Sequence, residues 1–98
     1  MPSVFKFMGY VFYFWSREDG EPVHIHVAKG RAHADATKFW LLRSGEALLV
    51  HNKSKISEKD LKKIKKVIED NKDEIMSKWF DHFDSIEFYN KLGLVNKK

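Results

Sequence analysis

The chain has 98 residues, of which 43% are hydrophobic and 14% aromatic, with a formal net charge of +4 and no cysteine. This length allows a single hydrophobic core, and the composition is that of a folded domain. The lack of cysteine excludes disulfides, cysteine-ligated metals and thiol nucleophiles. The N-terminus has no secretory pattern, and no apolar run approaches the roughly 20 residues of a membrane helix. We therefore expect one cytoplasmic domain, residues 1–98, without a membrane segment.

The first half of the sequence predicts four or five short strands within residues 1–52. Aromatic and β-branched residues are concentrated in five segments: Val4–Met8, Tyr10–Ser16, Val23–Val27, Ala34–Leu42 and Ala47–His51. Gly9 separates the first two segments, and Asp19-Gly20 with Pro22 predicts the chain reversal before the third. The last segment has the weakest strand pattern, so the expected number stays at four or five.

The second half predicts helical structure over residues 57–92. Apolar residues recur there at helical spacings: Leu61, Ile64, Val67, Ile68, Ile75, Trp79, Phe83 and Ile86. Ser57 and Asp60 resemble a capping box at the start, and Gly93 ends the helix at the latest. Asn71-Lys72 interrupts the apolar stripe, so the helix is either continuous or broken near Asn71. Together the two halves predict an α+β fold, an antiparallel β-meander with a long C-terminal helix packed on one face.

His24 and His26 are the most informative polar residues, because they alternate with Val23, Ile25 and Val27 in a predicted strand. Alternate side chains share a face, so the two imidazoles should lie together opposite the core, about 7 Å apart at their Cα atoms. Such a pair can bind a metal, transfer protons or contact phosphate. An ordinary hydrogen-bonded pair is the alternative. Since the spacing places no third ligand, we predict no metal and no other cofactor.

Lys38 and Trp40 share a face of the fourth predicted strand, as Tyr13 and Trp15 do on the second. If these faces align with the histidines, the uncovered side of the sheet is basic and aromatic, which is typical of surfaces that stack single-stranded bases. The alternative is that these aromatic residues are core. His82 could complete the cluster if the helix passes near it. Three carboxylates are candidates for orienting such a cluster: Glu18, Asp35 and Asp81.

Lysines crowd the stretch from residue 53 to residue 66, where only Glu58 and Asp60 oppose them, whereas the rest of the helix is more acidic. A basic end of this kind can contact a polyanion without sequence preference. The alternative is a solvated lysine-rich helix face. The candidate nucleic-acid contacts are therefore Lys53, Lys55, Lys59, Lys62, Lys63 and Lys66, together with Trp40.

Several motifs together resemble a small prokaryotic family of unknown function. They are Met1-Pro2, Gly9-Tyr10-x-Phe12-x-Phe14-x-Ser16, Glu21-Pro22-x-His24-x-His26-Val27, Lys38-Phe39-Trp40-Leu41 and the Trp79–Phe83 segment. Genes of that family often stand beside a gene for another small uncharacterised domain, in an arrangement that resembles a toxin–antitoxin pair. The resemblance implies a small protein partner encoded nearby and an action on RNA or the translation machinery. The family's recurrent polar positions correspond here to Glu21, His24, His26, Lys38 and His82. The chain extends past Phe83, where the family pattern is expected to stop.

Two hypotheses of different classes follow. In the first, the chain is the RNA-binding component of a toxin–antitoxin-like pair and acts as a metal-independent ribonuclease. His24 and His26 would then serve as general acid and base, Lys38 would stabilise the phosphorane charge, and His82 would complete the catalytic site. In the second, it is a non-catalytic protein interaction module with structural histidines. Convergence of these side chains in an open groove would favour catalysis, and burial or dispersal would favour the module.

Overall fold

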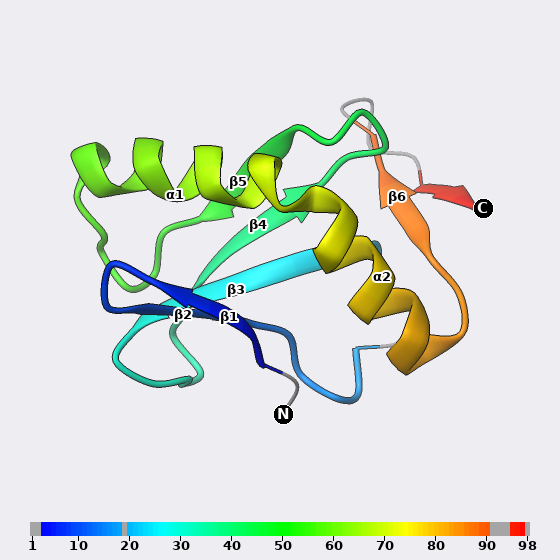
Figure 1. Cartoon of the computed structure of the whole chain (residues 1–98), viewed down its shortest axis with the longest axis horizontal. Helices are drawn as coiled ribbons and strands as arrows, with labels where there is room; N and C mark the ends of the chain where they lie inside the picture. The colour runs from blue at the N-terminus through cyan, green and yellow to red at the C-terminus, as the bar shows by residue number, and fades with distance from the viewer. Residues whose placement is uncertain (1–2, 19, 91–94, 98) are drawn as a thin grey trace.

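The computed structural model describes residues 3–18, 20–90 and 95–97, and shows a five-stranded antiparallel sheet with two helices packed against it (Figure 1). The sheet order is β1-β2-β3-β4-β5, and a separate two-stranded sheet pairs β6 with β7. The bounds are β1 Ser3–Phe7, β2 Tyr10–Tyr13, β3 His24–Lys29, β4 Thr37–Leu41, β5 Ala47–His51, α1 Glu58–Asp70, α2 Lys72–Phe83, β6 Glu87–Tyr89 and β7 Val95–Lys97. The predicted α+β meander is confirmed, with five strands.

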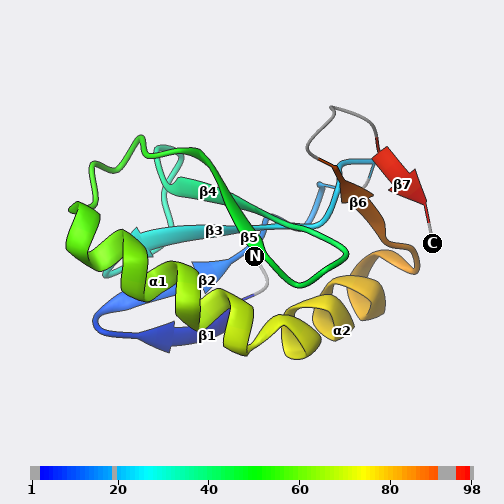
Figure 2. The ribbon, with the colours of Figure 1, turned by 90° about the horizontal axis from the view of Figure 1, so that it is seen from above.

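The core lies between the sheet and the two helices. Seen from above, both helices lie on the same side of the sheet (Figure 2). Val23, Ile25 and Val27 point into this core and are completely buried, as the alternation predicts. The helices contribute four fully or almost fully buried side chains to it: Ile64, Ile68, Ile75 and Trp79. The apolar stripe therefore does join the helices to the sheet.

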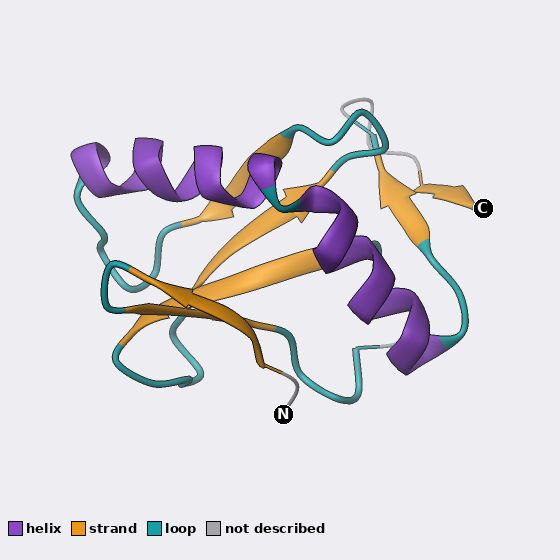
Figure 3. Cartoon of the chain, viewed as in Figure 1, coloured by secondary structure: helices purple, strands orange, loops and turns teal. Residues whose placement is uncertain are grey.

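The helical segment is two helices, broken at Asn71. Ser57 caps α1 by accepting a hydrogen bond from the Asp60 N–H at 3.2 Å. Asn71 ends α1 and precedes α2, which settles the predicted interruption in favour of a break. Figure 3 shows the short loop that separates the two helices. Neither helix is especially long, so the prediction of a long helix is not met.

The predicted helical range, residues 57–92, is wrong for residues 84–90. Asp84 adopts a left-handed conformation with φ of 60°, and its N–H bonds the Phe80 carbonyl, which stops α2. Residues 87–89 then form β6, whose Glu87 carbonyl accepts a 2.8 Å hydrogen bond from the Val23 N–H. Apolar spacing alone could not reveal this end, because Ile86 continues the period by chance. The predicted limit at Gly93 lies outside the described residues.

Strand register determines which polar side chains become neighbours. Tyr13 is opposite His26, and His26 is opposite Lys38, across β2, β3 and β4. His24 is opposite Trp40 in the same way. The meander therefore brings the candidate residues of three strands together at one end of the sheet. No helix in the described part of the chain is long and apolar enough to cross a membrane.

Replacing Trp79 by alanine should lower the free energy of unfolding by about 3–5 kcal/mol, because the buried indole packs on Phe14 and Phe83 and its loss leaves a large cavity. The neighbouring Phe80 is 51% exposed on the same helix, so Phe80→Ala is a matched control that should cost less than about 1 kcal/mol. Denaturant unfolding measures both. Equal losses in the two variants would show that Trp79 does not anchor the helix.

Candidate functional site

His24 and His26 lie side by side on β3 but are buried, not displayed on an open surface. His24 has no exposed surface and His26 retains 9% of its own. Their ring centroids are 4.9 Å apart with the rings nearly perpendicular. The segment between β2 and β3 folds back over them and carries Glu18. The sequence prediction that the two imidazoles lie together is confirmed, and their burial is the outcome that favours structural histidines.

Glu18 contacts both imidazoles through a single carboxylate oxygen. Its Oε2 atom lies 2.8 Å from His24 Nε2 and 2.9 Å from His26 Nε2. The other oxygen, Oε1, accepts a 2.7 Å hydrogen bond from the Trp15 N–H. Only 11% of the Glu18 side chain is exposed. One carboxylate therefore connects the β2–β3 segment to two positions on β3.

The pKa of Glu18 is lowered from 4.5 to about 2. Burial by itself would raise this pKa, but the close contacts with His24 and His26 and the Trp15 N–H outweigh that effect. Glu18 is consequently a carboxylate at every pH near neutrality. A buried negative charge of this kind requires compensation by the two rings or by a cation.

The His24 ring is fixed in its orientation by the backbone. Its Nδ1 atom lies 2.9 Å from the Pro22 carbonyl oxygen, which can only accept, so Nδ1 carries the proton of this hydrogen bond. Nε2 then faces Glu18, yet it is a buried atom that makes no hydrogen bond with good geometry to any described residue. Glu18, His24 and His26 could hold a metal ion, since their ligand atoms all lie within 4.8 Å of one another.

Aromatic side chains close off the two histidines. Tyr13 stacks on His26 at a centroid distance of 5.5 Å, and Trp15 lies 6.3 Å from the same ring. Trp40 and Trp79 contact His24 edge to face at 5.8 and 5.1 Å. The cavities beside Tyr10, His82, Glu69 and Phe7 are lined by neither His24 nor His26. The two rings are therefore almost completely enclosed.

Lys38 lies beside the cluster but interacts with other groups. Its ammonium is 3.1 Å from Glu21 and 4.5 Å from the centre of the Trp40 ring. Trp40 in turn stacks on Tyr89 at 5.0 Å with the rings nearly parallel. A base that stacked on Trp40 would have to compete with these contacts. Lys38 and Trp40 do lie beside the histidines, but the predicted uncovered face is not found, because Tyr13 is completely buried, as the alternative of core aromatic residues predicts.

His82 is not brought into the cluster. It is exposed at the end of α2, where Nε2 lies 3.1 Å from the Ser16 carbonyl oxygen and the ring packs on Phe14 and Phe83. Of the three candidate carboxylates only Glu18 reaches the histidines, while Asp35 and Asp81 are exposed. The structure therefore unites His24, His26 and Glu18, places Lys38 beside them, and separates His82.

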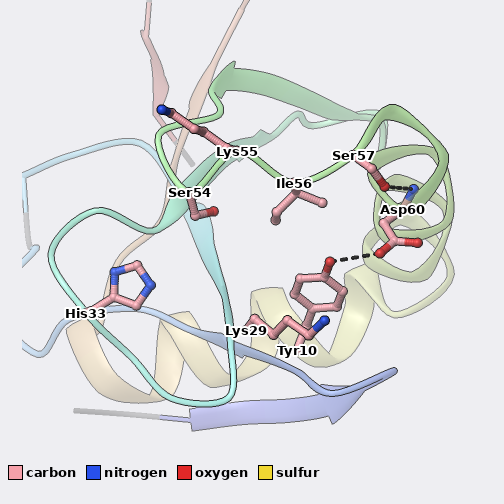
Figure 4. A pocket seen from close by; sticks show the side chains of 8 residues that line it. All are labelled: Tyr10, Lys29, His33, Ser54, Lys55, Ile56, Ser57 and Asp60. Carbon is pink, nitrogen blue, oxygen red and sulfur yellow. Dashed lines mark hydrogen bonds between the residues drawn. The ribbon is translucent and has the colours of Figure 1, made fainter.

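A cavity of about 400 Å³ lies at the other end of the sheet, beside the start of α1 (Figure 4). It is lined by Tyr10, Lys29, His33, Ser54, Lys55, Ile56, Ser57 and Asp60. Lys55 was a sequence candidate, whereas Lys29 and His33 were missed. Lys29 ends β3 and His33 lies in the β3–β4 loop, whereas Lys55 lies in the β5–α1 loop. Their proximity therefore depends on the conformations of these loops, which the local sequence does not predict. No motif in the sequence around Lys29 and His33 marks them as binding residues.

Most of the candidate lysines are exposed. Lys53, Lys55, Lys59, Lys62 and Lys63 are exposed and form none of the ion pairs found among the described residues. Lys65 and Lys66 are different, because they pair with Glu69 and Asp70 one turn later. Lys66 is therefore a weaker candidate for an anion contact than the sequence indicated.

We predict that Glu18→Gln destabilises the metal-free protein by about 2 kcal/mol at pH 7, allowing for screening by solvent. Because folding lowers the pKa of Glu18 from 4.5 to about 2, its contribution is complete above pH 4.5 and is lost as the pH falls toward 2. Denaturant unfolding at several pH values should show the two proteins converging in acid. A difference that persists at pH 2 would contradict the assigned role.

A family model described as "Domain of unknown function (DUF4160)" matches residues 9–80. The matched range contains Glu18, His24, His26 and Lys38, and ends before His82. No curated protein and no solved structure matches the chain. Since the match covers well over half of the sequence, the chain belongs to this family of domains of unknown function.

Proposed function

We propose that this domain binds RNA without cleaving it, as one component of a toxin–antitoxin-like protein pair. The observation that carries the proposal is the cavity beside α1, where Lys29, His33 and Lys55 from three separate segments surround one opening. Basic side chains from different segments can contact several phosphates of a flexible strand at once. The pairing with a second protein rests on the family resemblance.

Charge within the cavity is divided between two sides. In Figure 4 Asp60 and Lys29 lie on the side of Tyr10, and His33 and Ser54 lie on the other. The Tyr10 hydroxyl donates a 2.8 Å hydrogen bond to Asp60, and burial together with this bond raises the pKa of Tyr10. The Asp60 charge opposes an anion on its own side. A phosphate is therefore expected at the side of His33 and Ser54.

The basic surface continues along α1. Lys59, Lys62 and Lys63 are exposed on this helix, and Lys53 and Lys55 precede it in the β5–α1 loop. Ammonium groups on flexible stems neutralise phosphates but do not read bases. The expected ligand is consequently a single-stranded or irregular RNA that is bound through its backbone, with little sequence preference.

The buried histidines support binding and not cleavage. General acid–base catalysis requires an imidazole within hydrogen-bonding reach of the reacting atoms. His24 is fully buried, and the Nε2 atoms of both rings face Glu18. A 2′-hydroxyl or a leaving oxygen would need to displace these contacts. We therefore assign the pair a structural role within this proposal.

The test is binding of a fluorescently labelled single-stranded RNA, measured by anisotropy at several salt concentrations. Affinity should fall steeply with salt, and each lysine that contacts a phosphate should account for a slope of about 0.7 on logarithmic axes. Lys29→Gln with Lys55→Gln should weaken binding about tenfold at low salt and reduce that slope. Lys78→Gln on α2 removes one positive charge at the other end of the molecule and should have little effect, whereas Lys29→Gln and Lys55→Gln should each weaken binding when introduced singly.

Binding that is absent at low ionic strength, or equally reduced by Lys78→Gln, would contradict the assignment of this surface. The RNA recovered from the assay should also be intact. If it is cleaved, and His26→Ala abolishes cleavage in a folded protein, the ribonuclease hypothesis replaces the binding one.

A non-catalytic protein interaction module is the second candidate, and the edge strand β5 favours it. Leu49 and Val50 on β5 are 42% and 40% exposed, and β5 has no further strand beside it in the described sheet. An open edge of this kind can pair with a strand of another protein. Leu49→Lys should then abolish co-purification with the product of the adjacent gene, while Phe80→Lys on α2 should leave it unchanged. If the Leu49→Lys variant still co-purified with that product, β5 would not be the edge that binds it.

A further inference from the structure

The Glu18–His24–His26 cluster has the dimensions of a metal site. The shared Oε2 atom lies 2.8 and 2.9 Å from the two Nε2 atoms, and all three ligand atoms lie within 4.8 Å of one another. Ligands bound about 2.1 Å from one ion stand about 3 Å apart at right angles and about 3.4 Å apart in a tetrahedron. An ion bound by all three residues therefore needs each oxygen–nitrogen distance to lengthen by up to about 0.6 Å, and the two Nε2 atoms, which lie within 4.8 Å of each other, to stand about 3 to 3.4 Å apart.

The short contact requires a positive charge between the His24 ring and the carboxylate, supplied either by a second proton on His24 or by a metal ion. The His24 Nδ1 proton is used by the Pro22 carbonyl, so a neutral His24 presents a lone pair at Nε2. That nitrogen is completely buried, has no hydrogen-bond partner among the described residues, and lies 2.8 Å from a carboxylate oxygen. Two acceptors this close repel each other unless a proton or a metal ion joins them.

The surrounding contacts resemble those that orient metal ligands. A histidine that binds a metal through one ring nitrogen usually donates its other N–H to a carbonyl or carboxylate, as His24 does to Pro22. The Trp15 N–H holds the second Glu18 oxygen at 2.7 Å. Tyr13, Trp15 and Trp40 place aromatic rings around the two imidazoles. Such a shell limits access of water and fixes the ligand geometry.

We infer that Glu18, His24 and His26 bind one divalent first-row transition-metal ion, for which zinc is the expected occupant. Two imidazoles and a carboxylate suit zinc and disfavour magnesium or calcium, which prefer oxygen ligands. The ion would join the β2–β3 segment to β3 and leave a coordination position on the side where Glu18 and His26 each retain 11% of their side-chain exposure. This site is independent of the proposed RNA surface at the other end of the sheet.

The competing account is a doubly protonated His24 that forms an ion pair with Glu18. Both accounts explain the short contact, but they differ in their response to zinc. In the metal account, zinc takes the place of the proton that joins Glu18 to the imidazole nitrogens. In the ion-pair account, added zinc has no specific site.

The experiment is a zinc titration of chelator-treated full-length protein, followed by isothermal calorimetry and by thermal unfolding. One zinc ion should bind per chain and raise the melting temperature. Glu18→Gln and His26→Gln should each weaken binding by at least about 100-fold, since loss of a ligand costs more than loss of a group that orients one. Glu21→Gln and His33→Gln change a nearby carboxylate and an exposed imidazole, and should leave zinc binding unchanged.

X-ray absorption of the zinc-loaded wild-type protein gives a second readout that does not depend on the folding of any variant. It should report two imidazole ligands and at least one oxygen ligand near 2 Å. Absence of zinc binding to the folded wild-type protein would overturn the inference. It would also be overturned if Glu18→Gln bound zinc like the wild type, or if His33→Gln removed the ion, because the ion would then sit at another surface. None of these results depends on whether the protein binds RNA.

Discussion

One carboxylate oxygen placed between two buried imidazoles organises this end of the molecule. Glu18 has its pKa held at about 2, so it remains charged, and a buried charge requires fixed partners. Those partners, His24 and His26, belong to β3, while Glu18 belongs to the segment that precedes it. The contact therefore closes the β2–β3 connection onto the sheet. Trp79 of α2 also packs against the His24 ring, at a centroid distance of 5.1 Å.

The two groups of candidate residues lie at different ends of the sheet and in different environments. Around Glu18 the polar groups are buried, paired and enclosed by aromatic rings, which is the environment of a structural or metal-binding cluster. Beside the start of α1 the basic groups are exposed and surround an open cavity. The cluster around Glu18 is closed, whereas the basic surface beside α1 is accessible to solvent.

Local periodicity predicted what depends on near neighbours in the sequence. Alternation placed Val23, Ile25 and Val27 in the core, and Ser57 and Asn71 marked real helix boundaries. Local periodicity did not predict contacts between residues that are distant in the sequence. Three carboxylates were equal candidates to accompany the histidines, and only the path of the β2–β3 segment selects Glu18. The end of α2 was missed because a single left-handed residue, Asp84, overrides an apolar period that continues to Ile86.

Nitrogen NMR of the imidazoles tests the central role of Glu18 most directly, because it reports the protonation state of each ring nitrogen. The account predicts that Glu18→Gln shifts the Nε2 resonances of both His24 and His26, while His24 Nδ1 keeps its proton and the exposed His33 and His82 do not change. If the resonances of His24 and His26 were insensitive to Glu18→Gln and resembled those of His33, the buried cluster would not exist in solution.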